Sequence, residues 1–149
     1  MSTKGRIIAV VLLVAAAAGV YAWKEFNRKN KDLTAVQADH SVQAVAWINE
    51  FTANDTAANA KYLGKVVSVE GLVKQVEKDD DGKYTLVLGD TADMSSVRCS
   101  MDSVHAHNAS SLQRGTPVTI KGIYIDFNKD DMGLGSDVKM NRCVVSKNK

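Results

Sequence analysis

The chain has 149 residues, 24% of them charged, with ten glycines and one proline, which fits one globular domain and excludes a disordered or collagen-like protein. Six of its 19 basic residues precede residue 33, and the remainder of the chain carries 13 basic residues against 15 acidic ones, a net charge of about −2. Because nucleic-acid affinity comes largely from clustered Lys and Arg that neutralise phosphates, this balance argues against strong, sequence-independent nucleic-acid binding.

An uncharged apolar run, residues 7–23, follows a short basic N-terminus, residues 1–6. As a helix with a rise of ~1.5 Å per residue, the run would be roughly 25 Å long, at the short end of what spans a hydrocarbon core of ~30 Å. Tyr21 and Trp23 lie where an interfacial aromatic belt is expected. The run predicts a transmembrane helix. A cleaved secretory signal stays open as the alternative, because small-residue cleavage patterns occur in the second half of the run.

A basic stem, residues 24–38, follows the apolar run and is typical of a flank that contacts lipid headgroups. Two basic residues and the amino terminus precede the run and four basic residues follow it, so charge counting alone would keep the downstream side cytoplasmic by a small margin. The first cysteine of the chain is Cys99. A lipoprotein anchor is therefore excluded, since lipidation modifies a cysteine directly after the apolar run.

Two short helices are expected at the start of the remaining domain, residues 39–149. The first has four apolar residues at the i, i+3, i+4 and i+7 positions of one face: Ala44, Trp47, Ile48 and Phe51. The candidate N-caps are Asp39 or Ser41 for the first helix and Asn54 or Asp55 for the second. The second helix covers residues 56–63 and ends at Gly64, where a left-handed residue is needed. We expect the pair to close one end of the core, with a lid over a ligand as the alternative.

From Lys65 onward the apolar residues alternate with a period of two, which predicts five strands. The expected strands lie in residues 65–78, 84–88, 97–101, 117–127 and 138–146. A polar stretch with a possible helix, residues 105–114, separates the third strand from the fourth.

Two of these strands carry a glycine at the same place in similar sequences, VSVEGLV at residues 67–73 and VTIKGIY at residues 118–124. In the second of them the apolar positions are even before Gly122 and odd after it, so the apolar face is expected to change sides at the glycine. Gly71 is expected to act similarly. A residue that permits a bulge or sharp coil lets one strand serve two halves of a curled sheet. Two long, bent strands among five predict a small closed barrel, with a flat sandwich as the alternative.

Two further motifs stand out: F-x-x-N-x-x-A-A-N-A-K-Y-L-G-K-V-V-x-V-x-G-x-V at residues 51–73 and L-x-x-G-x-x-V-x-I-x-G at residues 112–122. With these motifs and the paired cysteines, the sequence resembles the OB-fold family called tRNA_anti-like. The resemblance covers roughly residues 40–146. Members look like small bacterial envelope proteins, often with a lipoprotein signal or one N-terminal span.

The resemblance implies a five-stranded Greek-key OB barrel, preceded here by a transmembrane helix and a short helical lead. By fold analogy alone it also implies nucleic-acid binding, but a fold does not determine a function. Together with the cysteines it favours a domain on the periplasmic or extracytoplasmic side. We expect the membrane to be one partner, through residues 7–23, and the barrel face to bind single-stranded nucleic acid, an oligosaccharide or a protein.

In OB barrels, ligands lie across the second and third strands and two flanking loops. In this sequence that surface is expected to include five residues: Lys74, Lys83, Thr85, Arg98 and Tyr124. Single-strand binders need stacking aromatics beside a basic groove. Here both flanking loops are acidic, so a solvated barrel wall remains the alternative interpretation.

Cys99 and Cys143 fall on the third and fifth strands, which are neighbours in an OB barrel. A disulfide between them is conceivable and would suit an oxidising compartment, and two buried free thiols are the alternative.

No enzymatic activity, cofactor or metal is expected. The sequence has no nucleophile elbow, phosphate loop or zinc-protease motif. A twelve-residue stretch that begins at Asp126 has oxygen ligands at calcium-loop positions, but Asp131 stands where such a loop needs glycine. His105 and His107 are interpreted as surface residues of a polar connector.

Overall fold

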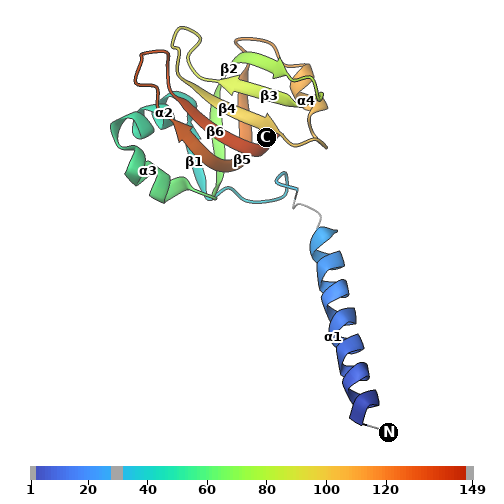
Figure 1. Cartoon of the computed structure of the whole chain (residues 1–149). Helices are drawn as coiled ribbons and strands as arrows, with labels where there is room; N and C mark the ends of the chain where they lie inside the picture. The colour runs from blue at the N-terminus through green and yellow to red at the C-terminus, as the bar shows by residue number, and fades with distance from the viewer. Residues whose placement is uncertain (1–2, 28–31, 147–149) are drawn as a thin grey trace. The chain divides into compact units, whose positions relative to one another are not determined.

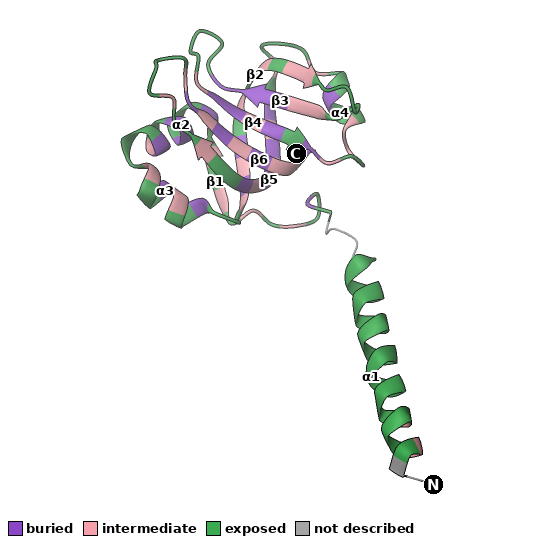
Figure 2. Ribbon diagram, viewed as in Figure 1, coloured by how far each residue is buried: buried purple, intermediate pink, exposed green. Residues whose placement is uncertain are grey.

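The computed structural model describes residues 3–27 and 32–146, and the chain divides into two compact units, residues 1–31 and 32–149 (Figure 1). The first unit contains helix α1 (Thr3–Phe26), whose side chains are exposed along almost all of its length (Figure 2). Its segment Lys4–Phe26 is long and apolar enough to cross a membrane, a property that it shares with signal sequences.

The second unit is a closed barrel. Its strands are β2 (Val66–Lys78), β3 (Tyr84–Leu88), β4 (Ser96–Met101), β5 (Pro117–Asn128) and β6 (Asp137–Ser146). They follow the order β2-β3-β4-β6-β5, and an antiparallel pairing of β2 with β5 closes the circle. Among these five strands, β4 and β6 form the one parallel pair, and the other pairs are antiparallel. The predicted five-stranded Greek-key OB barrel is confirmed.

A short strand that the sequence did not predict, β1 (His40–Gln43), runs parallel to β2 and leads into helix α2 (Ala44–Ala53). Asp39 therefore does not cap that helix: its carboxylate accepts a hydrogen bond from the Val66 amide at 2.9 Å and so supports β1. Residues 40–43 contain a single apolar residue, Val42, in four positions, which is too little to show a period.

Helices α2 and α3 (Asp55–Tyr62) pack on the barrel and share its core. The four residues of the predicted apolar face of α2 are its buried residues. Asn54 caps α3 by accepting the Ala57 amide at 3.0 Å, and Gly64 follows the helix with φ +72°, both as predicted. The indole of Trp47 meets the rings of Phe51 and Tyr62 edge-on, at centroid distances of 5.7 and 5.4 Å. This aromatic cluster anchors the helices to the barrel.

The predicted change of face at Gly71 and Gly122 is wrong. In β5 the buried positions continue through Gly122 without interruption, from Ile120 to Tyr124, both 0% exposed, whereas Ile125 is 42% exposed. The alternation changes only beyond Tyr124, where β5 has an extra residue relative to β6. In β2 it changes at Lys74, the extra residue of a bulge against β3.

The two glycines make room for close neighbours instead. A Cβ atom on Gly122 would lie 2.5 Å from the Cys143 sulfur, and one on Gly71 would lie 2.8 Å from the Ala44 Cβ. Opposite Gly122, strand β6 has its own bulge, in which Arg142 takes φ +52°. Both glycines lie in strands of the barrel, so they support its architecture through packing rather than as hinges.

Candidate binding surface

The outer face of β3 and β4, the second and third strands of the barrel, is the surface on which OB barrels place their ligands, and β6 continues this face beside β4. Strand alternation puts Leu86, Cys99 and Met140 inward and leaves Thr85, Arg98 and Lys139 outward. Arg98 pairs in register with Lys139 on β6, and Thr85 lies on the neighbouring strand, diagonal to Arg98. The structure thus brings together two of the five predicted residues, Thr85 and Arg98.

The basic side chains of this face are paired with carboxylates. The Arg98 guanidinium donates a hydrogen bond to Glu77, with about a third of each side chain exposed. The Lys139 ammonium lies 3.7 Å from a carboxylate oxygen of Asp126. A cation that already faces a carboxylate attracts a phosphate less, so this face is close to neutral despite its arginine and lysine.

Lys74 has a structural role that its sequence position did not reveal. As the extra residue of the β2 bulge, it reaches the loop between β3 and β4. Its ammonium donates to the carbonyls of Asp93 and Ser95 and to the Ser96 hydroxyl, the last two at 2.9 and 3.1 Å. All three ammonium hydrogens therefore have an acceptor within the protein.

Lys83 and Tyr124 complete the predicted set, but they lie apart from each other. Lys83 is exposed in the loop between β2 and β3, 3.9 Å from Asp81. Tyr124 is 0% exposed and belongs to the core, because the inward phase of β5 continues past Gly122. Its hydroxyl donates to Asn59, and burial raises the pKa of its phenol well above the usual range. Tyr124 therefore presents no stacking surface to a ligand.

Three loops border the face and are strongly acidic. Residues 79–83, 89–95 and 129–136 contain seven aspartates against two lysines. Several of these carboxylates also cap their own loops, as when Asp130 accepts the amides of Met132 and Leu134. Asp130, which occupies one of the calcium-loop positions that the sequence analysis considered and rejected, is thus engaged with backbone. Within residues 3–27 and 32–146, no group of three or more His, Cys, Asp or Glu side chains is placed to hold a metal ion.

Two of these loops expose large apolar side chains that the sequence analysis missed. Met94 is 62% exposed, Met132 is 85% exposed and Leu134 is 66% exposed. We call these three residues the apolar patch. A signal was present in the sequence, because these large apolar residues stand among Asp, Gly and Ser outside any strand pattern.

The loops of the apolar patch are tied together. The Ser136 amide donates to the Ser95 hydroxyl at 3.1 Å, and the Ser96 amide donates to the Ser136 carbonyl at 3.0 Å. Gly135 has φ +94°, and a Cβ there would lie 2.5 Å from the Met94 carbonyl carbon. Residues about forty positions apart in the sequence therefore form one surface, at the end of the barrel where Figure 1 shows both loops.

The cysteines lie side by side in the core. Cys99 and Cys143 are both 0% exposed free thiols on the paired strands β4 and β6. Burial, with a smaller contribution from a hydrogen bond between the two thiols, raises the pKa of Cys143 well above its usual range. A disulfide between them stays a prediction.

The sequence profile of the tRNA_anti-like family matches residues 1–138. The chain belongs to this family. No curated protein matches the sequence.

Two solved structures are similar to this chain to different extents. A crystal structure described as a "putative nucleic acid-binding lipoprotein" from Klebsiella pneumoniae superposes with a TM-score of 0.53 and 21% identity, over 80% of this chain and 100% of the other. The asparaginyl-tRNA synthetase of Pyrococcus horikoshii matches with a TM-score of 0.40 and 20% identity, over 57% of this chain but only 20% of the enzyme. At these identities the similarity concerns the fold alone.

Proposed function

We propose that this protein is a non-enzymatic binding module, anchored by α1 in a bacterial envelope membrane, whose OB barrel binds another protein. The observation that carries the proposal is the combination of a charge-paired barrel face with the apolar patch beside it. Exposed apolar side chains that are held in fixed positions favour a protein partner, since their burial on binding stabilises a complex.

The charge arrangement disfavours single-stranded nucleic acid as the ligand. Binding to phosphates gains affinity by releasing counterions from Lys and Arg contacts. On this face, such contacts would first have to break the ion pairs of Arg98 and Lys139. Stacking platforms are also missing: every Phe, Tyr and Trp within residues 32–146 is buried or half-buried.

The acidic loops indicate what the partner contributes. Asp90, Asp93 and Asp131 lie in the same two loops as the apolar patch. Complementarity of charge steers association and selects partners. The partner surface is accordingly a segment with apolar side chains flanked by Lys or Arg.

The membrane attachment rests on α1 and on the family resemblance. The uncharged run of residues 7–23 is flanked by basic residues on both sides, which suits a helix that stays in the bilayer. Family members with a lipoprotein signal or a single span favour an extracytoplasmic barrel. The likeness to a structure described as a lipoprotein is consistent with this placement.

Nucleic-acid binding is the second candidate function. The Klebsiella structure carries that description, and synthetase domains share the fold. Arg98 and Thr85 would then be the contact residues, and affinity would fall steeply with salt.

Site-specific photo-crosslinking in intact cells separates the two functions. A photoreactive residue replaces Met132 in one variant and Leu63 in a matched control, which is 62% exposed but lies after α3. We expect a discrete protein adduct from position 132 and none from position 63. Charge reversal by Asp131→Lys should weaken the adduct. Adducts with nucleic acid, or equal protein adducts from both positions, would contradict the proposal.

A further inference from the structure

A pocket of about 570 Å³ lies apart from the barrel face and the apolar patch. It is formed by Lys121 of β5, the end of β6, the segment around the short helix α4 (His107–Ser110), and the segment that enters the barrel unit. Its polar lining consists of Thr34, His105, His107, Asn108, Lys121 and Ser146. Val144, 1% exposed, contributes an apolar part of the wall. The volume lies within the range of small-molecule sites, about 300–1,000 Å³.

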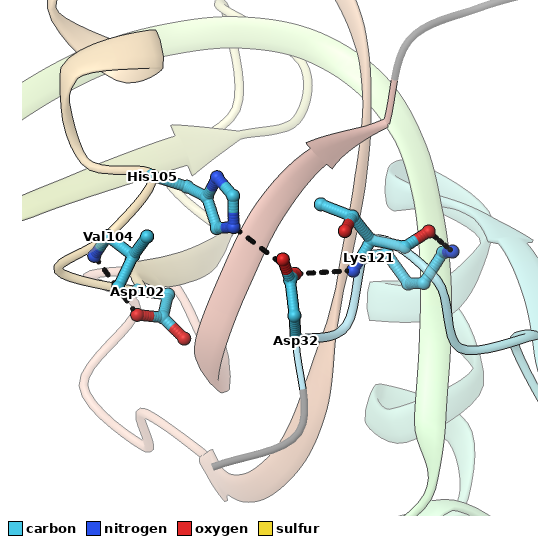
Figure 3. A network of polar contacts seen from close by, with 6 residues as sticks. Asp32, Asp102, Val104, His105 and Lys121 are labelled. Atoms are coloured by element: carbon cyan, nitrogen blue, oxygen red, sulfur yellow. Dashed lines mark hydrogen bonds and ion pairs between the residues drawn. The ribbon is translucent and has the colours of Figure 1, made fainter. Parts of the chain in front are cut away.

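The walls of this pocket are fixed by polar contacts between segments far apart in the sequence (Figure 3). The Lys121 ammonium donates to the carbonyls of Thr34 and Val36, at 3.3 and 2.7 Å. The His105 ring nitrogen lies 3.2 Å from an Asp32 carboxylate oxygen. These contacts hold residues 32–36 across β5, so the pocket is already formed in the protein without a ligand.

The pocket lining carries no carboxylate among the residues that the structure describes. The Asp32 carboxylate lies against the His105 imidazole, and it accepts a hydrogen bond from the Thr34 amide at 2.9 Å. The hydrogen bonds from Thr34, and then the one from His105, keep the pKa of Asp32 below its usual range. Asp32 is therefore ionised, and its carboxylate is hydrogen-bonded to Thr34 and His105.

The lining is instead rich in hydrogen-bond donors. Lys121 uses two of its three ammonium hydrogens on carbonyls, which leaves one for a ligand. The side chains of His107 and Asn108 have no hydrogen-bond partner among residues 3–27 and 32–146. The Ser146 hydroxyl adds one further donor, whereas the Thr34 side chain already hydrogen-bonds the Asp32 carboxylate.

We infer that this pocket binds a phosphate ester, with Lys121 as the fixed positive charge and the imidazole and amide side chains as donors to its oxygens. An ammonium group is a common phosphate ligand in proteins, and charge-assisted hydrogen bonds are the stronger ones. A neutral sugar would leave the lysine charge without a counter-charge, and a cation would be repelled. The pocket is larger than a bare phosphate, so the ester carries an organic group that lies against Val144.

Histidine NMR tests this inference on the full chain in lipid nanodiscs. The chain has three histidines, and His40 packs edge-on against Tyr62, 5.0 Å between centroids, away from the pocket lining. His40 is therefore an internal control. We expect glycerol phosphate to shift the ring signals of His105 and His107 saturably, and neutral glycerol to leave them unchanged.

Two lipid compositions distinguish the source of the phosphate. If nanodiscs that contain phosphatidic acid give the shifts and soluble glycerol phosphate does not, the ligand is a lipid headgroup. If the soluble ester gives them in phosphatidylcholine nanodiscs, the ligand is a soluble metabolite. Either result supports a phosphate site, and the absence of saturable shifts with both probes overturns it.

Variants test the assigned residues. Lys121→Gln should weaken glycerol phosphate binding about tenfold or more, because it removes a charge-assisted contact. Lys139→Gln, on the barrel face, is the matched control and should bind like the unchanged chain. Since Lys121 also holds residues 32–36, His107→Gln provides a second variant, at an exposed side chain that has no hydrogen-bond partner among residues 3–27 and 32–146, and it should weaken binding as well. Unchanged affinity in both pocket variants would overturn the assignment.

Discussion

Gly122→Ala should destabilise the barrel through a local collision with Cys143. The added methyl would lie 2.5 Å from the Cys143 sulfur and 3.1 Å from the Asn141 carbonyl oxygen, whereas unstrained carbon contacts lie near 3.5–4.0 Å. Overpacking of this kind costs about 1–3 kcal/mol. Alanine also lowers the conformational entropy of the unfolded chain, which by itself stabilises the folded protein by about 0.4–1 kcal/mol. The net expectation is a loss of about 1–2 kcal/mol in the free energy of unfolding.

Guanidinium unfolding of the full chain in mild detergent measures this loss. Trp47, 1% exposed, reports on the core, and a Trp23→Phe background removes the signal of α1. The double variant Gly122→Ala/Cys143→Ala should recover part of the loss relative to the sum of the single changes, because the sulfur is gone. If Gly122 acted as a hinge, the loss of stability caused by Gly122→Ala would not depend on the residue at position 143. Additive effects, or no destabilisation, would refute the packing explanation.

Three further outcomes follow from buried polar groups. Tyr124→Phe should lower the free energy of unfolding by about 1 kcal/mol, because it removes the hydrogen bond to Asn59; equal denaturation midpoints would contradict this role. In a reduced sample, Cys99 and Cys143 should resist a maleimide reagent until the protein unfolds, since both are 0% exposed; rapid labelling of the folded protein would disagree. Burial raises the pKa of Asp137, so its stabilising contribution is present below the unfolded pKa of about 3.9 and is lost as pH rises through the folded pKa. Asp137→Asn should flatten the pH dependence of stability in that range, and an unchanged slope would exclude this carboxyl as its source.

Long, strongly patterned elements could be predicted from the sequence. The helical face of Ala44, Trp47, Ile48 and Phe51 is buried as expected, because four apolar residues at helical spacing have one favourable way to pack. The alternation predicted the strands, because it depends on near neighbours in the chain, which a single sequence displays directly. Closure of the barrel by β2 and β5 is a long-range pairing; the family resemblance implied it correctly, whereas the change of face at the glycines that was offered for it was wrong.

The position of the bulges could not be predicted in the same way. Ile125 and Leu72 are apolar, and their spacing suggested a change of face at the glycines, yet both are exposed. A bulge is defined by the partner strand: the extra residues in β2 and β5 appear only once β3 and β6 are in register. Tyr124 was predicted on the ligand face for the same reason. With the change of face wrongly assumed at Gly122, its side chain was expected on the surface, whereas it lies in the core.

The surfaces that we propose as binding sites depend on contacts across the fold. The apolar patch requires the Ser95–Ser136 tie, and the pocket requires residue 34 to lie against residue 121. Nothing in either local sequence predicts these approaches. The acidic character of the loops was visible in the sequence, but only the structure shows that their methionines and leucine are exposed on one shared surface.

Binding of a fluorescent single-stranded oligonucleotide, followed by anisotropy at about 150 mM salt, tests the central claim most directly. If the ion pairs neutralise the barrel face, the unchanged chain shows no saturable binding. The variant Glu77→Gln/Asp126→Asn, in which Arg98 and Lys139 lose their carboxylates, then gains weak binding that added salt abolishes. Tight binding by the unchanged chain that falls steeply with salt and disappears in Arg98→Ala would contradict the account.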